Sequence, residues 1–351
     1  MTPEITSLTK ITAASIVSAL FVYFTMPFFR GVAIKLRIVD FPGKRKMHRV
    51  ATPLLGGVAV YCGFAAGILL SRLPVSGSLT AILSASTVIL VLGAVDDARG
   101  LSARFRIAVQ FAAALIVVLF GDRINFLPNG PIGNAVEILV SLIWMVGITN
   151  AFNYLDGLDG LAAGSAVINL VAFGAILYRT GQPQLFTVCM VLAGACLGFL
   201  PHNFKREKRR VFLGDAGSTF LGFTLASIGL CGYWAKGDPV KVAIPILILG
   251  VPIFDMVFTT VMRVAEKKVS TIYGWLKYAG KDHFHHYLVE LKLTNNNAVI
   301  LIYATSVLLG LSAMIASTAG TMTALMSICQ GFIIFGIIGV IIVMGKRRNG
   351  G

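Results

Sequence analysis

The stretch from Asn150 to Leu161, NAFNYLDGLDGL, gathers carboxylates, carboxamides and glycines within an otherwise apolar chain. Asp156 and Asp159 are three residues apart, so a helical turn would bring both carboxylates onto one face. Gly157 and Gly160 allow the backbone to bend or a ligand to approach closely. The stretch is either a polar loop that caps the following helix or a site that holds a charged ligand.

Two more acids, Asp96 and Asp97, are adjacent at the end of an apolar run and are followed by Arg99, Arg104 and Arg106. Neighbouring carboxylates at a helix C-terminus repel each other and oppose the helix dipole, so a purely structural role would be unfavourable. A cation or a proton would relieve both costs. Mg²⁺ binds carboxylates and bridges them to substrate phosphates, which guanidinium groups also bind. The pair therefore predicts a site for a phosphate-bearing substrate.

Asp215 belongs to the sequence FLGDAGS, which follows a basic stretch at residues 205–210. The acid lies where an apolar helix is expected to begin. Free N–H groups at a helix start stabilise a carboxylate and can also hold a phosphate. Taken alone, the motif fits an ordinary N-cap as well as a ligand site.

Three other regions carry ionisable side chains. Asp255 lies inside an apolar run, where a charge is costly and usually faces the bundle interior; a structural pair with Arg263 or a backbone donor is the alternative. The segment KDHFHH at residues 281–286 could bind a transition metal, donate to phosphate or transfer protons. The loop around Lys46 and His48 is basic, which is typical of a patch that binds lipid headgroups.

Composition assigns these residues to an integral membrane protein. Of 351 residues, 56% are hydrophobic and 13% are charged, and the mean hydropathy is +0.83. Soluble domains have about a quarter of charged residues. Repeated apolar runs of roughly 17 to 25 residues indicate membrane-spanning helices rather than a barrel. The five cysteines fall inside these runs and show no metal or disulfide spacing.

We predict an all-α polytopic bundle of about eleven transmembrane helices, forming a single domain over residues 1–351. The predicted spans are 9–33, 53–72, 78–95, 107–121, 135–152, 161–178, 184–201, 216–234, 241–262, 298–317 and 322–344. Most of the 30 Lys and Arg residues fall in loops on one side, so the N-terminus is predicted outside and the C-terminus inside. This bias accounts for the net charge of +15, and nucleic-acid binding is not expected.

Most acids fall on the same inner side as the basic residues. The polar loops expected to carry the catalytic motifs are 34–52, 96–106, 150–161, 202–218 and 263–297. In chain order, the motifs are an Asp-Asp pair at 96–97, NxxNxxDGxDGL at 150–161, FxGDxGS at 212–218, PxxD at 252–255 and HxHH at 283–286. This set resembles the polyprenyl-phosphate N-acetylhexosamine-1-phosphate transferases of glycosyltransferase family 4, over about residues 37–290.

The resemblance implies that the enzyme transfers an N-acetylhexosamine-1-phosphate from a UDP-sugar to undecaprenyl phosphate and releases UMP. Within the family, the chain is most similar to the bacterial enzymes that transfer GlcNAc-1-phosphate. The resemblance also implies a bacterial inner membrane, an active site facing the cytoplasm, Mg²⁺ or Mn²⁺ as cofactor, and a homodimer as one assembly. The implied catalytic residues are Asp96, Asp97, Asp156, Asp159 and Asp215, with Asp97 and Asp215 as metal ligands. The implied substrate-binding residues are Lys46, His48, Arg104, Arg106, Asn150, Asn153, Asn203, Phe212, His283, His285 and His286.

Three alternatives remain beside this interpretation. Relatives that transfer phospho-N-acetylmuramoyl-pentapeptide typically have three consecutive histidines after a proline, whereas this chain has His-Phe-His-His; the basic loop at 205–210 favours the GlcNAc enzymes that initiate cell-surface glycans. The segment at 269–283 departs from the family pattern, so the sequence does not determine which N-acetylhexosamine is transferred.

CDP-alcohol phosphotransferases also use acidic motifs, but they carry them on one stretch, and this chain has no such stretch. A cation-coupled transporter of an anionic solute would explain Asp255 and the Gly- and Pro-interrupted helices.

Overall fold

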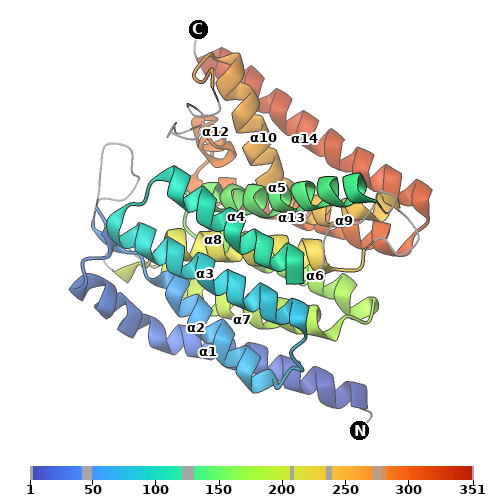
Figure 1. The fold of residues 1–351 in the computed structure, drawn as a ribbon. Coiled ribbons are helices and arrows are strands. Elements are labelled where there is room, and N and C mark those ends of the chain that lie inside the picture. Colours follow the sequence, from blue (N-terminus) through green and yellow to red (C-terminus); the bar gives the residue numbers. More distant parts are fainter. Residues whose placement is uncertain are drawn as a thin grey trace. The chain divides into compact units, whose positions relative to one another are not determined.

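The chain is almost entirely helical (Figure 1), as its apolar runs predict. The computed structural model describes residues 3–41, 50–120, 130–205, 209–234, 239–271, 274, 278, 280 and 282–349. The chain forms two units, Met1–Tyr233 and Trp234–Gly351, and each has helices of its own. A single domain over the whole chain stays a prediction.

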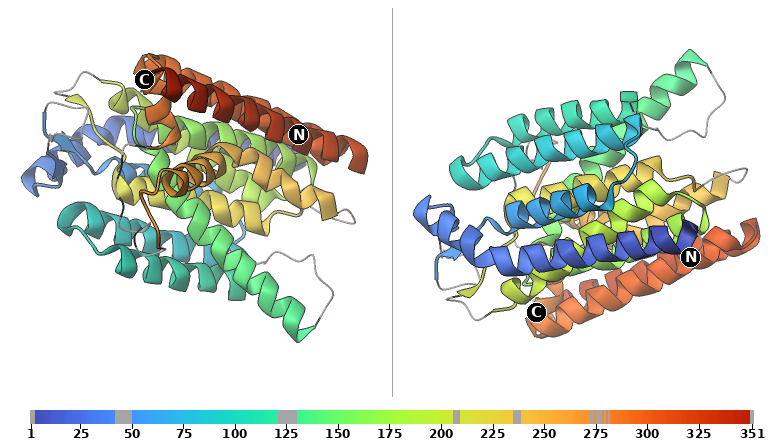
Figure 2. Two further views of the ribbon diagram at one scale, coloured as in Figure 1. Left: turned by 90° about the horizontal axis from the view of Figure 1, so that it is seen from above. Right: turned by 90° about the horizontal axis from the view of Figure 1, so that it is seen from below.

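The first unit contains the helices α1 to α8. They are α1 (Pro3–Lys35), α2 (Gly56–Ser71), α3 (Gly77–Arg99), α4 (Ala103–Phe120), α5 (Pro131–Leu155), α6 (Leu161–Arg179), α7 (Pro183–Asn203) and α8 (Gly214–Cys231). Helix α1 packs against α2 and α7 (Figure 1; Figure 2). Between α1 and α2, the strands β1 (Val39–Asp40) and β2 (Thr52–Pro53) form a short antiparallel pair with Asp40 opposite Thr52.

Helix α8 is the central helix of the first unit. Every one of its residues except Asp215 is buried, because α2, α3, α5 and α6 pack around it. Its sequence is apolar on all sides, as a helix surrounded by other helices requires. Asp215, in the first turn, is therefore the polar end of a buried helix, and it lies where the sequence predicted a helix start.

Small residues let α2 and α3 approach the first turns of α8. A Cβ added at Gly57 would lie 2.2 Å from the Cα of Gly217. A Cβ added at Gly93 would lie 2.5 Å from the Cα of Ala216. Such backbone contact is possible only where side chains are absent or very small. Because Asp215 precedes Ala216, these contacts fix where its carboxylate emerges.

Gly57→Ala is expected to destabilise the protein, since the new methyl group would overlap the backbone of α8. Overpacking of this kind costs about 1–3 kcal/mol. The unfolding temperature of the detergent-solubilised protein should fall by several degrees. Gly31→Ala in α1 is the matched control, because no atom lies within 4 Å of its added Cβ. Equal unfolding temperatures for wild type and Gly57→Ala would show that α2 and α8 can separate without cost.

The first described element of the second unit is the 3-10 turn η2 (Pro239–Val242). Its helices are α9 (Ala243–Ile248), α10 (Gly250–Ala265), α12 (Phe284–Glu290), α13 (Asn295–Thr318) and α14 (Thr321–Asn349). Helix α13 packs against both α9 and α14. Helix α10 is unusual because its buried face carries polar residues, namely Asp255, Thr259 and Arg263.

Every predicted span coincides with helix, although the ninth is not a single helix. The span at 241–262 falls on α9 and α10, which are separated at Leu249. Pro252 explains the break, because proline is tolerated in the first turn of a helix but not in its interior. Within the described part of the chain, eight helices are long and apolar enough to cross a membrane, namely α1, α3 to α7, α13 and α14. The protein is thus a multi-pass membrane protein, while eleven spans and the N-out orientation stay predictions.

Candidate active site

The Asp-Asp pair lies in the last turn of α3, as predicted. Gly100 ends the helix with a φ of +68°, a conformation that glycine adopts without strain. The chain then folds back, so that the N–H of Leu101 donates to Asp96 Oδ1 at 2.6 Å. The Asp96 side chain is only 6% exposed. Its carboxylate is therefore held in one orientation by the turn that follows it.

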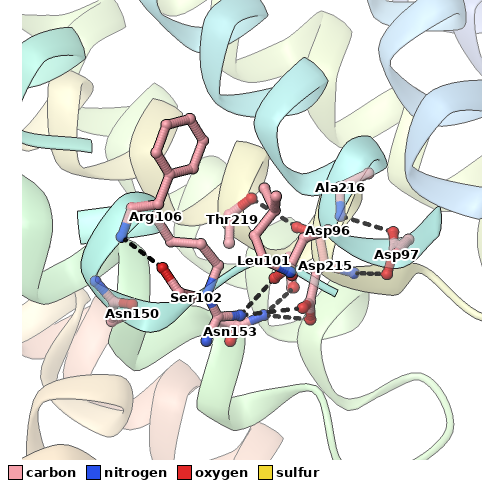
Figure 3. A network of polar contacts seen from close by, with 12 residues as sticks. Asp96, Asp97, Leu101, Ser102, Arg106, Asn150, Asn153, Asp215, Ala216 and Thr219 are labelled. Carbon is pink, nitrogen blue, oxygen red and sulfur yellow. Dashed lines mark hydrogen bonds and ion pairs between the residues drawn. The ribbon is translucent and has the colours of Figure 1, made fainter. Parts of the chain in front are cut away.

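Asp97 faces a different partner, the start of α8 (Figure 3). Its Oδ1 accepts the N–H of Asp215 at 2.9 Å, and its Oδ2 accepts the N–H of Ala216 at 3.0 Å. The first N–H groups of a helix have no partner within the helix and form the positive end of its dipole. The two adjacent acids are thus separated in function, because Asp97 stabilises a helix start. A metal-binding role for Asp97 stays a prediction.

Arg106, in the first turn of α4, lies between two carboxylates. Its Nη1 is 2.5 Å from Asp96 Oδ2 and 3.4 Å from Asp215 Oδ2 (Figure 3). The side chains of Arg106 and Asp215 are 35% and 38% exposed, so both can be reached by a ligand. Side chains of opposite charge from α3, α4 and α8 therefore meet at one place. This cluster of Asp96, Arg106 and Asp215 is called the acid–arginine cluster below.

Asn153 of α5 extends the acid–arginine cluster, and a second carboxamide of this helix, Asn150, makes a separate contact. Asn153 Nδ2 donates to Asp215 Oδ1 at 2.8 Å and to Ser218 Oγ at 2.9 Å. One turn earlier, Asn150 Nδ2 donates to Gln110 Oε1 at 2.7 Å. Gln110 is buried and was not among the predicted site residues, although a lone carboxamide within an apolar run is a signal for a polar contact between helices.

The rest of NAFNYLDGLDGL forms the turn between α5 and α6. Asp156 follows the last residue of α5. Burial, together with the charges of Asp215 and Asp159, raises the pKa of Asp156 to about 7. Asp159 Oδ2 forms an ion pair with Arg210 Nη1 at 2.8 Å. The two acids of the motif thus have different surroundings, since Asp156 is close to like charges and Asp159 is close to an opposite charge.

Asn203 ties this turn to the segment before α8. Its Oδ1 accepts the N–H of Gly160, and its Nδ2 donates to the main-chain O of Val211 at 2.9 Å. Gly160 has a φ of +76°, and a Cβ at this residue would lie 2.1 Å from the Phe204 ring. Only glycine fits such a conformation and such a close contact. Asn203 therefore holds the turn in place, and its predicted contact with substrate stays a prediction.

Phe212 is held by the end of β2 and the start of α2. Its N–H donates to the main-chain O of Pro53 at 2.8 Å, and its own O accepts the N–H of Gly56 at 3.1 Å. The ring is half-buried. Of the other predicted substrate contacts, Arg104 is exposed in the first turn of α4. Lys46 and His48 lie outside the described residues.

The histidine segment belongs to the second unit. The Oδ1 of Asp255 accepts the N–H of Phe284 at 2.5 Å, and Oδ2 lies 3.1 Å from His283 Nδ1. Asp255 thus binds a backbone donor, which is one of the two structural partners considered from the sequence. Arg263, the other, instead forms two hydrogen bonds with Asp282, at 2.9 and 2.8 Å.

The three histidines are not equivalent. His285 is 1% exposed, and neither of its ring nitrogens has a hydrogen-bond partner among the described residues. Burial lowers the pKa of His285 to about 3, so the ring is neutral at physiological pH. Its ring stacks at 10° to that of His283, while His286 is half-buried. Substrate contacts of the three residues stay predictions.

The carboxylate oxygens of Asp96 and Asp215 in the acid–arginine cluster fit Mg²⁺. This ion commonly uses one or two carboxylates together with substrate phosphates and water. Arg106 already shows that a cation is stable between Asp96 and Asp215. Within the described ranges, no three His, Cys, Asp or Glu side chains form a metal site by themselves.

Known proteins resemble this chain over most of its length. Residues 79–233 match the family described as glycosyl transferase family 4. A Bacillus subtilis (strain 168) protein named probable undecaprenyl-phosphate N-acetylglucosaminyl 1-phosphate transferase is 35% identical, over 88% of this chain and 86% of that protein. Decaprenyl-phosphate N-acetylglucosaminephosphotransferase of Mycolicibacterium smegmatis is 34% identical, over 84% and 79%. Undecaprenyl-phosphate alpha-N-acetylglucosaminyl 1-phosphate transferase of Escherichia coli (strain K12) is 30% identical, over 85% and 82%.

Proposed function

Because the chain belongs to glycosyl transferase family 4, we propose that it transfers GlcNAc-1-phosphate from UDP-GlcNAc to a polyprenyl phosphate. The products would be polyprenyl-diphosphate-GlcNAc and UMP. The relatives named above are GlcNAc enzymes, which favours this sugar over the muramoyl-pentapeptide alternative. The observation that carries the proposal is the acid–arginine cluster, which joins the ends of three apolar helices. A lipid acceptor and an anionic nucleotide donor require this combination of a membrane domain and a charged site.

In the proposed reaction, an oxygen of the polyprenyl phosphate attacks the β-phosphorus of the UDP-sugar. The bond from this phosphorus to the bridging oxygen breaks, and that oxygen leaves with UMP. A phosphate monoester is already largely dianionic near neutral pH, so the protein hardly needs to deprotonate the polyprenyl phosphate. Its main tasks are to hold two anions together and to neutralise their charge. Arg106 can do so directly, because guanidinium groups form paired hydrogen bonds with phosphate oxygens.

Mg²⁺ is the proposed cofactor, with Asp215 as its principal ligand. Asp96 and Asp215 both contact Arg106 Nη1, which makes Asp96 a better second carboxylate than Asp97. When bound, Mg²⁺ would offset the charge of the donor diphosphate. Asn153 would keep Asp215 in place, because it donates to the carboxylate oxygen that Arg106 does not contact.

A donor panel tests the proposal. The purified protein in lipid nanodiscs, supplied with undecaprenyl phosphate and Mg²⁺, should release UMP from UDP-GlcNAc. UDP-GalNAc and the muramoyl-pentapeptide nucleotide should give much less, and decaprenyl phosphate tests the acceptor length. The absence of UMP with every donor would contradict the transferase. Uptake of labelled UDP-sugar into proteoliposomes without product would instead support a transporter.

We further propose the bacterial inner membrane as the location, with the acid–arginine cluster on the cytoplasmic side. This follows from the concentration of Lys and Arg in the loops that contain the motifs. UDP-sugars are made in the cytoplasm, so a donor site on this face has access to its substrate. In inside-out membrane vesicles, added UDP-GlcNAc should be consumed without detergent; consumption only by right-side-out vesicles would reverse the orientation.

A further inference from the structure

One face of α10 carries a row of polar residues that water does not reach. Asp255, Thr259 and Arg263 recur at every fourth residue, so their side chains lie along the same side of the helix. They are 0%, 1% and 2% exposed. Buried polar groups are unfavourable unless each finds a partner. The partners of the row therefore indicate what it stabilises.

All three residues bind the chain at the start of α12. Arg263 donates from Nε and Nη2 to the Asp282 carboxylate at 2.9 and 2.8 Å. Thr259 Oγ1 donates to the main-chain O of Asp282 at 3.0 Å. Asp255 Oδ1 accepts the N–H of Phe284 at 2.5 Å. The row fixes the backbone on both sides of His283.

The Phe284 side chain adds an apolar anchor. It is fully buried and packs edge to face against Phe254 of α10, with ring centroids 5.4 Å apart. Phe254 in turn stacks on Phe335 of α14 at 4.5 Å. The phenylalanine that interrupts the histidines is thus a packing residue. With the backbone and this ring fixed, the direction of the neighbouring His283 side chain is determined as well.

The second oxygen of Asp255 makes a contact that anchoring does not require. Oδ2 lies 3.1 Å from His283 Nδ1, and the Asp255 side chain is fully buried. If the Asp255 carboxylate is ionised, it can only accept a hydrogen bond, and Nδ1 then carries the proton. The partner of one ring nitrogen fixes the role of the other, here Nε2. Asp255 therefore sets both the orientation and the tautomer of His283.

We propose that Asp255 is a positioning residue that acts in the transfer reaction through His283. The inference rests on the proposed function, because that function supplies the reaction in which His283 takes part. Asp255 itself is enclosed by the protein and does not touch substrate. Its carboxylate is needed because a neutral side chain of the same shape would not keep the proton on Nδ1.

The tautomer can be measured without any assay of activity. Nitrogen NMR of the full-length protein labelled with [¹⁵N]histidine, with His283→Asn used for assignment, should show a protonated Nδ1 in the wild type. In Asp255→Asn, the amide oxygen accepts from Phe284 and the amide NH₂ faces Nδ1, so the proton should move to Nε2. An unprotonated Nδ1 in the wild type overturns the proposal, even if Asp255→Asn does not fold. A protonated Nδ1 that persists in folded Asp255→Asn overturns it as well.

Glu266→Gln is the matched control on the same helix. Glu266 follows α10, and its carboxylate pairs with Lys268 and Lys346. Its substitution removes one carboxylate and leaves the contacts of His283 intact. The nitrogen signals of His283 should therefore be those of the wild type.

Kinetics test the same proposal through a double-mutant cycle. Asp255→Asn should lower kcat/KM by about 10- to 100-fold, as is typical when the partner of a functional histidine is lost. In a His283→Ala background it should cause little further loss, because it acts through the missing ring. Additive losses would overturn the proposal. If the wild type releases no UMP from any donor, the proposed function fails, while the nitrogen signals still decide whether Asp255 orients His283.

Discussion

Asp215→Asn is expected to lower kcat by about 1,000-fold or more while the protein remains folded. The asparagine has nearly the same shape but no charge, and in either orientation its NH₂ group would face a donor, Arg106 Nη1 or Asn153 Nδ2. The proposed Mg²⁺ would lose its principal ligand. The fold should persist, because Asp97 binds the N–H of residue 215 and not its side chain. UMP release and the unfolding temperature measure the two effects separately.

Removal of divalent cations tests the assignment of Asp215 as a Mg²⁺ ligand independently of the Asp215 substitution. EDTA should abolish UMP release by the wild type, and added Mg²⁺ should restore it. Asp215→Asn should need a higher Mg²⁺ concentration for its residual rate. Glu266→Gln removes a carboxylate of the second unit and should keep the wild-type Mg²⁺ dependence. Undiminished turnover after chelation, or a near-wild-type rate of Asp215→Asn, would contradict the metal assignment.

The sequence predicts the helices well because apolar runs determine them locally. The start of α8 beside Asp215 and the end of α3 after the Asp-Asp pair both follow from where polar residues interrupt such runs. The break between α9 and α10 escaped the prediction, since the run at 241–262 is continuous in hydropathy. Pro252 was the signal, because its backbone N cannot donate within a helix interior.

The site could be predicted only as a set of residues. The motifs led to Asp96, Asn153 and Asp215, which do meet in one cluster. Their contacts depend on details that no spacing contains. The turn at Gly100, with its positive φ, lets Asp96 contact Arg106, while Asp97 contacts the start of α8. Arg99, Arg104 and Arg106 all follow the Asp-Asp pair, and the sequence does not distinguish them. The packing of α4 places Arg106 next to Asp96 and Asp215.

The two carboxylate oxygens of Asp97 each accept an N–H of the first turn of α8. Asp97→Ala is expected to reduce the free energy of unfolding by about 1–3 kcal/mol, because two partly buried N–H donors lose their acceptor. It should also lower kcat by about 100-fold, since a shift of about 1 Å in a residue that holds substrate can have that effect.

The Mg²⁺ dependence then separates the two roles that Asp97 could have. If Asp97 only holds the helix start, Asp97→Asn should lower the unfolding temperature and kcat but keep the Mg²⁺ concentration for half-maximal rate. A ligand of the metal would show the opposite pattern, with an unchanged unfolding temperature and a raised Mg²⁺ requirement. The geometry favours the first result, because both Asp97 oxygens already accept hydrogen bonds from α8. Asp96 and Asp215, by contrast, both contact the Arg106 guanidinium.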